Sequence, residues 1–439
     1  MEFEDAFQVA DRAVLVKTGK HLSDLQQILL EGAWNGDTYE AIGQNRGYSP
    51  RYLQRDVGPK FWRLLSEALG ERVEKKNFRN ALERYRRRGR AASNPAAREP
   101  EPTMGKFPDG PVALGSPFYV ELDPIEARCC QEILRPGALI SIRGPQHMGK
   151  TSLIQRILAR ARDNNCKAAY LNFRQADEAA FASLDKFLRW FCANLCLNLD
   201  LEHQIEDYWD ENIGSKVSAT RYLQGRLLQH FDSPLVIALD EVDRLFPYAE
   251  IAPDFLSALR SWHEEAKNLE IWKKLRLIVA HATEVYVKLD LHQSPFNVGL
   301  PVKLPEFSPE QVRNLARVYE IDWRREEAEK LMGAIGGHPY LVRLALYHIS
   351  QEHKNADDLL EEAATESGIY SSYLRGHLVY LQKHPKLAAA MKRVVDAEDS
   401  VRLESMNAYQ LESMGLLQLQ GNNARPSCEL YRQYFRDRI

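Results

Sequence analysis

The feature that most constrains this chain is the stretch from Gly137 to Leu153, GALISIRGPQHMGKTSL. It predicts a buried strand from Ala138 to Ile142, then a loop of the pattern G-x-x-x-x-G-K-[ST], then a helix with apolar periodicity. Backbone N–H groups of such a loop surround a phosphate, because glycine tolerates the required dihedrals and the helix N-terminus favours negative charge. The stretch therefore predicts a phosphate-binding loop, and the alternative is a chance match in a strand-to-helix turn.

Two side chains of this loop carry specific expectations. Lys150 is predicted to reach the β- and γ-phosphates of a nucleotide, and Thr151 to offer its hydroxyl to Mg²⁺. The cofactors expected from the motif are ATP or ADP with Mg²⁺.

A second stretch, LVIALDEVD from Leu235 to Asp243, is an apolar run that ends in acidic residues. Buried parallel strands have such runs, and ligands bind at their carboxyl ends. Asp240 is predicted to hold Mg²⁺ through water, and Glu241 to polarise the water that attacks the γ-phosphate. Either carboxylate alone would also suit a helix cap.

Further candidates follow these two stretches. The strand Leu275 to Ala280 precedes Thr283, which is a candidate sensor of the γ-phosphate or, alternatively, a turn cap, while His281 is expected to be structural. In GGHPY, Pro339 is placed to pack on adenine, with Arg343 one turn onward facing the phosphates. The alternative is a plain turn between helices, which Gly-Gly and Pro explain by themselves.

Strands alternate with helices through the middle of the chain, which predicts an α/β fold with a parallel sheet covered on both faces. The part after about residue 304 is helical and includes a capping box at Ser308. Helices followed by two short strands near Gly421 indicate a C-terminal winged helix. The expected domains are a helix-turn-helix domain (1–88), a flexible linker (89–111), a P-loop ATPase core (112–303), a helical lid (304–367) and a winged helix (368–439).

The N-terminal 88 residues are expected to be wholly helical, with a helix-turn-helix in which Pro50 starts the third helix after Ser49. Residues 46–90 hold 14 Lys and Arg against 5 Asp and Glu, although the whole chain has a net charge of −3. This asymmetry indicates a nucleic-acid or acidic partner. A protein-interaction module with solvated charges is the open alternative. The residues proposed to contact nucleic acid are Arg51, Gln54, Arg55, Lys75 and Lys76.

Composition excludes several other classes of protein. The chain has 439 residues, of which 44% are hydrophobic and 27% charged, as in ordinary soluble proteins. It has no run of eighteen apolar residues, and its N-terminus is acidic, so we expect a cytoplasmic protein without a membrane segment. Cys192 and Cys196 share a helix face without a second ligand pair, so core packing is favoured over a structural metal.

With these residues assembled, the chain resembles the signal-transducing P-loop ATPases with numerous domains (the STAND class), a branch of the AAA+ superfamily. More narrowly, it resembles the cyanobacterial "AAA-like domain" family preceded by a helix-turn-helix domain. The stretches that carry the resemblance are SPFYVELDPIE, GALISIRGPQHMGKTSL, LVIALDEVDRLF, LRLIVAHATEVY, GGHPYLVRLALYH and CELYRQYFRDRI.

The resemblance implies an ATP/ADP switch that is closed with ADP and self-associates with ATP. It implies that Phe118, Tyr119, Val120 and Pro339 flank adenine, and that Gly144 to Ser152, including Gly149, bind phosphates. It also implies the roles given above for Asp240, Glu241 and Thr283. The class usually carries a repeat array as a stimulus sensor, which is not visible here. Arg260 and Arg276 are candidates for an arginine finger by location only.

The function predicted is a slowly hydrolysing, nucleotide-controlled signalling or transcription-associated ATPase whose N-terminal domain contacts DNA or a partner protein. Two alternatives stay open: a processive AAA+ ATPase that remodels nucleic acid or protein, and an adaptor that binds nucleotide without significant hydrolysis.

Overall fold

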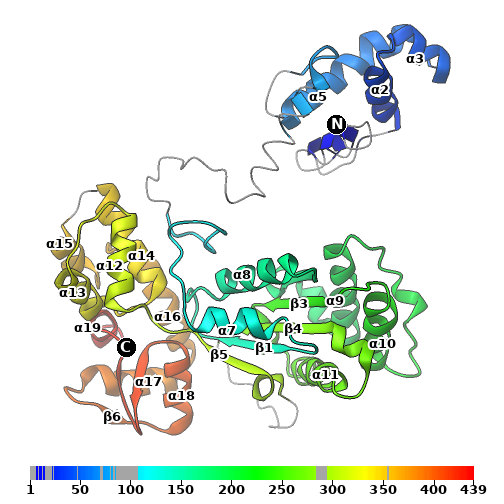
Figure 1. Ribbon diagram of the computed structural model, residues 1–439. Helices are drawn as coiled ribbons and strands as arrows, with labels where there is room; N and C mark the ends of the chain where they lie inside the picture. Colours follow the sequence, from blue (N-terminus) through cyan, green and yellow to red (C-terminus); the bar gives the residue numbers. More distant parts are fainter. Residues whose placement is uncertain are drawn as a thin grey trace. The chain divides into compact units, whose positions relative to one another are not determined.

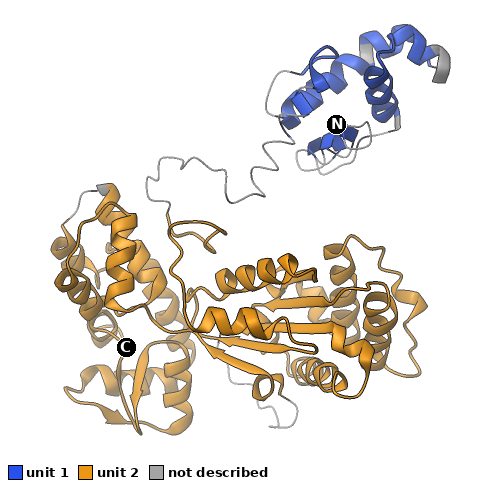
Figure 2. Cartoon of the chain, viewed as in Figure 1, with its two compact units in different colours: residues 1–102 blue, residues 103–439 orange. Residues whose placement is uncertain are grey.

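The computed structural model of the chain divides into two compact units, Met1–Pro102 and Thr103–Ile439, which Figure 2 colours separately. The residues it describes are 6–7, 9–11, 13–14, 22, 24–46, 48–69, 73–79, 81–82, 85, 107–282, 294–352 and 355–439.

A five-stranded parallel sheet forms the centre of the second unit (Figure 1). The strands lie in the order β2-β3-β4-β1-β5. Their bounds are β1 Leu139–Arg143, β2 Lys167–Asn172, β3 Leu235–Asp240, β4 Leu275–His281 and β5 Leu300–Lys303. The parallel sheet predicted from the sequence is confirmed. Strand β4 separates β1, which leads into the phosphate loop, from β3, which ends in the acidic pair.

Helices cover both faces of this sheet, and alternate strand residues face two separate cores. Ile140 and Ala238 belong to the core that includes α7 and α8, whereas Leu139 and Ile237 belong to the core that includes α9, α10 and α11. In Figure 1, α8 and α11 accordingly lie on opposite sides of the sheet. The bounds are α7 Ile125–Glu132, α8 Lys150–Asp163, α9 Leu184–Asn198, α10 Ser215–Tyr222 and α11 Ala252–Glu265.

The chain after the sheet is mainly helical. Ser308 and Gln311 form the predicted capping box at the start of the first of these helices. The helices are α12 Pro309–Val318, α13 Arg325–Ile335, α14 Pro339–Glu352, α15 Ala356–Glu362, α16 Ser371–Lys383, α17 Pro385–Asp396, α18 Ser405–Ser413 and α19 Glu429–Arg436. Strands β6 Val401–Arg402, β7 Leu417–Gln420 and β8 Asn423–Pro426 form an antiparallel sheet in the order β6-β8-β7. The predicted strand pair near Gly421 is therefore present, and the winged-helix assignment stays a prediction.

The first unit is helical in its described part, with α2 Asp24–Asn35, α3 Tyr39–Arg46, α4 Pro50–Tyr52, a π-helical turn Leu53–Val57 and α5 Gly58–Leu69. The third predicted helix begins at Pro50 as expected. Ile42 and Leu53 are buried in the core of this unit, and Tyr39 and Val57 pack against it. These contacts hold the two short helices of the predicted motif together.

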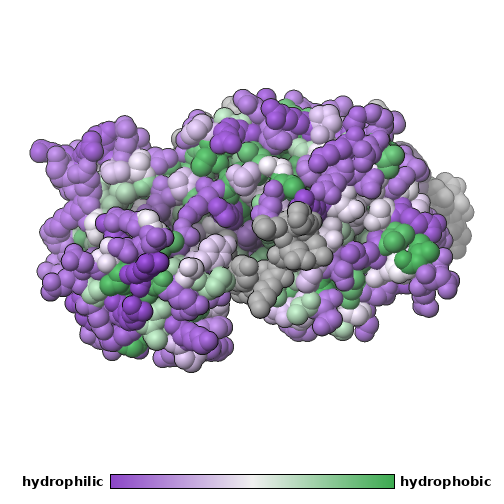
Figure 3. All heavy atoms as spheres, turned by 90° about the horizontal axis from the view of Figure 1, so that it is seen from below, coloured by the Kyte–Doolittle hydropathy of each residue, from purple (hydrophilic) through white to green (hydrophobic). Residues whose placement is uncertain are grey.

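Hydrophilic residues cover most of the face shown in Figure 3, and apolar residues appear there in small groups. None of the helices that the structure describes is long and apolar enough to cross a membrane. Cys192 and Cys196 lie on α9 and are fully buried in the core, in keeping with the packing role expected for them.

One glycine of this sheet gives a direct test of the fold. Gly299 has a φ of +71°, and a Cβ at this position would collide with the carbonyl oxygen of Leu139 in β1. We expect Gly299→Ala to destabilise the chain by about 3 kcal/mol through strain and overpacking. Urea unfolding followed by circular dichroism measures the change. Gly333→Ala is the control, because a Cβ there meets no atom within 4 Å and removes a glycine from the interior of α13, which stabilises by about 1 kcal/mol. Equal effects of the two substitutions would contradict the sheet register.

Candidate functional site

The phosphate loop connects β1 to α8 and is closed around its own lysine. Gly149 has a φ of 91°, a conformation that glycine adopts without strain, and Lys150 is the first residue of α8. Lys150 is buried, and its Nζ donates to the carbonyl oxygens of Gly144 at 3.0 Å and Pro145 at 2.8 Å. The ammonium group is therefore held against the loop at the N-terminus of the helix, where both the charge and the helix dipole favour an anion.

Asp240 ends β3 and is completely buried. Its Oδ2 accepts hydrogen bonds from the Thr151 hydroxyl at 2.6 Å and from the Tyr170 hydroxyl at 2.9 Å. Its Oδ1 accepts from the backbone N–H of Glu241 at 2.9 Å. A hydroxyl and a carboxylate in contact are oxygen ligands of the kind that Mg²⁺ prefers, so the two predicted metal residues, Thr151 and Asp240, fit that ion.

Glu241 lies at the edge of the same site with a φ of 55°, in the left-handed region. Its carboxylate accepts from Arg174 Nη2 at 3.1 Å and Nε at 3.2 Å, and its side chain is 20% exposed. Burial raises the pKa of Glu241, as does the neighbouring charge of Asp243, while Arg174 opposes the shift. A raised pKa makes a carboxylate a stronger base, as activation of water requires.

Asp243 follows β3 in the chain, and its side chain is hydrogen-bonded to the end of the neighbouring strand β4. Its Oδ1 accepts from the backbone N–H of Ala282 at 2.6 Å, directly after β4. Burial raises the pKa of Asp243. Thr283, the predicted sensor, follows Ala282 and lies outside the described residues. His281 is buried, its ring lies 4.3 Å from that of Phe296, and burial lowers its pKa to about 4, so its surroundings suit the structural role expected for it.

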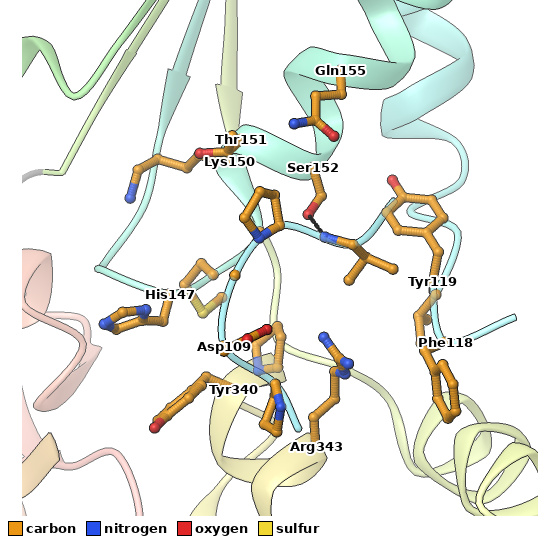
Figure 4. A pocket seen from close by; sticks show the side chains of 18 of the residues that line it. Asp109, Phe118, Tyr119, His147, Lys150, Thr151, Ser152, Gln155, Tyr340 and Arg343 are labelled. Atoms are coloured by element: carbon orange, nitrogen blue, oxygen red, sulfur yellow. Dashed lines mark hydrogen bonds between the residues drawn. The ribbon is translucent and has the colours of Figure 1, made fainter. Parts of the chain in front are cut away.

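A cavity of about 500 Å³ opens beside the phosphate loop. Figure 4 shows Lys150, Thr151 and Ser152 on one side of it and Tyr340 and Arg343 on the other. Its lining combines residues predicted from the sequence with others that were not: Phe107, Pro108, Asp109, Gly110, Pro111, Val112, Phe118, Tyr119, Val120, Leu122, His147, Met148, Gly149, Lys150, Thr151, Ser152, Gln155, Tyr170, Asn172, Arg174, Glu241, Phe307, Pro339, Tyr340 and Arg343. The volume is within the range of cavities that hold a small-molecule ligand.

The residues that the family resemblance assigns to adenine line this cavity. Tyr119 donates its hydroxyl to Glu126 at 2.6 Å, and the Arg156 guanidinium lies 3.1 Å from the centre of its ring. Val120 and Pro339 also line the cavity. Arg343 lines it one turn after Pro339, and among the described residues its buried Nε has no hydrogen-bond partner. An unpaired buried guanidinium nitrogen is costly, so a cavity that also holds Lys150 fits an anionic ligand.

Sequence reasoning missed three contributors to this site. Tyr170 and Arg174 come from β2 and the turn after it, and only the strand pairing places them beside Asp240 and Glu241. Ser152 was expected to contact phosphate, but its Oγ accepts from the backbone N–H of Val112 at 2.9 Å (Figure 4). The third missed contributor is the segment 107–112. The only signal for Tyr170 was a polar aromatic residue near the end of a predicted strand.

The segment 107–111 was expected to be part of a flexible linker. The structure describes it and places it on the wall of the cavity. We therefore propose that the ATPase core begins near residue 107 rather than 112.

The residues proposed to contact nucleic acid differ in what their side chains do. Arg51, Gln54 and Arg55 are exposed on α4 and the π-helical turn, and Lys76 is exposed as well. Lys75 instead donates to the carbonyl oxygen of Asp37, and its Nζ lies 4.6 Å from the centre of the Tyr39 ring. Burial lowers its pKa. These contacts within the unit argue against the phosphate contact expected for Lys75.

The two candidates for an arginine finger are both engaged inside their own chain. Arg276 is buried and donates to the carbonyl oxygens of Arg135 and Leu134, each at 3.1 Å, at the end of α7. Arg260 pairs with Glu264 at 2.9 Å and donates to the carbonyl of Ser294 at 3.1 Å. The structure therefore corrects the suggestion for Arg276, whose guanidinium stabilises the end of a helix.

Solved structures with similar folds include a Walker-type ATPase. A Walker-type ATPase of Pyrococcus abyssi superposes with a TM-score of 0.50 at 13% identity, covering 73% of this chain and 100% of that one. The ORC2 protein of Aeropyrum pernix, solved as ADPNP–ADP complexes, has a TM-score of 0.46 at 14% identity, covering 73% and 95%. A STAND protein with a tetratricopeptide repeat sensor from Pyrococcus horikoshii has a TM-score of 0.34 at 17% identity, covering 76% and 44%. The first of these supports a Walker-type ATPase fold.

Comparison with curated proteins gives no match. Two family models match the chain. Residues 1–85 match the vWA-MoxR associated protein N-terminal HTH, which confirms the helix-turn-helix predicted for this region. Residues 107–437 match the AAA-like domain. Because the second match covers well over half of the chain and includes the loop, the acidic pair and the cavity described above, this chain belongs to the AAA-like domain family.

Proposed function

We propose that the chain binds ATP and ADP with Mg²⁺ in the cavity beside the phosphate loop and hydrolyses ATP slowly. The observation that carries the proposal is that two distant segments of the chain meet at one cavity: Lys150 and Glu241 line it, and Asp240 is hydrogen-bonded to Thr151 beside it. In such a site the lysine and the helix N-terminus bind phosphate, and the aspartate holds a cation. The glutamate accepts a proton from the attacking water.

Each residue then has a defined task. Lys150 neutralises the terminal phosphates, and Arg343 approaches them from α14. Thr151 and Asp240 hold Mg²⁺, which when bound neutralises charge between the phosphate oxygens. Glu241 orients the attacking water and takes its proton. Thr283 completes the set as a sensor. The adenine ring packs against a wall formed by Tyr119, Val120 and Pro339.

Slow turnover follows from the ion pair between Arg174 and Glu241. Nη2 and Nε of Arg174 both donate to the same oxygen of Glu241, so this oxygen is not free to accept from the attacking water while the pair is closed. Turnover then requires that Glu241 leave Arg174. This requirement suits a switch better than the processive remodelling enzyme that the sequence left open.

The proposed output of the switch is self-association in the ATP state, with the N-terminal unit contacting DNA or a partner protein. Arg51, Gln54 and Arg55 are the exposed residues that support this contact, together with the basic balance of residues 46–90.

Light scattering of the intact chain tests the switch. We expect a discrete multimer with a non-hydrolysable ATP analogue and a smaller species with ADP. Lys150→Ala should keep the smaller mass with both nucleotides, because it removes the charge that binds the terminal phosphates. A mass that does not depend on nucleotide would exclude assembly as the output.

A further inference from the structure

Residues 107–113, which we call the strap, form a wall of the cavity that the proposed function assigns to nucleotide. Figure 4 shows this segment passing across the pocket, with Asp109 between the phosphate loop and Arg343. The structure places Phe107 to Val112, without interruption, on the lining of the cavity. A nucleotide in this cavity would therefore lie behind the strap.

One end of the strap is fixed to the ATPase core through α8. The backbone N–H of Val112 donates to Ser152 Oγ at 2.9 Å. Arg156 donates to the carbonyl oxygens of Val112 and Ala113, each at 3.1 Å. The same guanidinium stacks on Tyr119, which lines the cavity. This end is thus held by three hydrogen bonds between side chains of α8 and the backbone of the strap.

The other end is fixed to α14, the helix that carries Pro339, Tyr340 and Arg343. Phe107 packs edge-on against Tyr347, with ring centroids 5.3 Å apart, and Phe107 is still 44% exposed. This half-exposed aromatic contact is worth about 1 kcal/mol, less than the set of hydrogen bonds at the opposite end, and burial of the neighbouring Pro108 adds to it. The strap is therefore expected to open first at Phe107.

From this asymmetry we infer that the strap is the gate of nucleotide exchange, hinged at α8 and latched at α14 by Phe107 on Tyr347. The inference rests on the proposed function, since it concerns the nucleotide bound in that cavity. Opening of the latch uncovers the cavity, and closing it retains the nucleotide.

The test is the rate at which a fluorescent ADP analogue leaves the full-length chain when excess unlabelled ADP is added. We expect Phe107→Ala to raise the release rate about fivefold, the factor that corresponds to the lost ring contact. Leu114→Ala is the matched control, because Leu114 is 50% exposed, lies just beyond the strap and does not line the cavity. It should leave the release rate unchanged.

A double-mutant cycle separates the latch from general loosening. Tyr347→Leu should raise the rate about as much as Phe107→Ala, and the double variant no more than either alone, because both remove one contact. Hydrogen exchange at the Val112 amide gives a readout independent of release. This amide should stay protected in Phe107→Ala, since the hinge is intact.

Three results would overturn the gate. These are an unaltered release rate in Phe107→Ala, an equal acceleration in Leu114→Ala, and additive effects in the cycle. If the unaltered chain binds no ADP analogue at all, the proposed function fails and the gate with it, whereas binding with unaltered release removes the gate alone.

Discussion

Glu241→Gln is expected to lower the rate of ATP hydrolysis by about 10²- to 10⁴-fold, because glutamine cannot accept the proton of the attacking water. Nucleotide affinity should change little, since Lys150, Thr151 and Asp240 keep their contacts. Phosphate release at saturating Mg-ATP gives the rate, and titration with a fluorescent analogue gives the affinity.

Glu178→Gln is the matched control for this substitution. Glu178 pairs with Arg244 at 2.5 Å, much as Glu241 pairs with Arg174, but it is exposed and does not line the cavity. The Glu178→Gln variant should hydrolyse ATP at the rate of the unaltered chain. Phosphate release that persists unchanged in Glu241→Gln would show that Glu241 is not the base that activates water.

The second large effect expected is a loss of stability in acid caused by buried histidines. Burial lowers the pKa of His338 to about 3 and those of His281 and His377 to about 4. An unfolded histidine titrates near 6.5. Between about pH 6.5 and 4 the unfolded chain therefore binds protons that the folded chain does not, so stability falls as the pH falls. Above pH 6.5 these groups make no difference, because they are neutral in both states.

In that window each histidine lowers the free energy of unfolding by up to about 1.4 kcal/mol per pH unit, and the three together by up to about 4 kcal/mol per pH unit. Urea unfolding at pH 7, 6 and 5 measures the free energy of unfolding. His338→Gln should flatten the dependence by about a third, although it also disturbs the hydrogen bond from Nε2 to the Gln146 carbonyl. His230→Gln should not alter the slope, because His230 is exposed. Equal slopes in the two variants would contradict the prediction.

The parts of this protein that were predictable from its sequence are those specified by neighbouring residues. The phosphate loop, the acidic strand end and the capping box at Ser308 each lie within a few residues, and the structure has the secondary structure predicted for them. Strand β5 was not predicted. It contains Pro301 and lies at the edge of the sheet, the one place where proline costs no ladder hydrogen bond.

The remaining features depend on contacts between distant segments. Tyr170 and Asp240 meet only because β2 pairs with β3, and no local pattern encodes that register. The strap has the proline and glycine content of a linker, and composition describes the stiffness of a chain without showing where it docks. Lys75 has the charge of a phosphate contact, but only the fold brings Asp37 and Tyr39 to it.

The place of β1 in the sheet has a consequence for how the protein is made. Strand β1 is the first of the sheet to leave the ribosome, yet its two neighbours are β4 and β5, which follow more than 130 residues later. During synthesis β1 stays unpaired until β4 and β5 have been made, and its apolar residues Leu139, Ile140 and Ile142 stay without their neighbours in the sheet for that time. Pairing of such distant strands is slow because of the cost of closing a long loop. The strand that supports the phosphate loop is thus the part of this fold most in need of protection from aggregation before synthesis passes residue 303.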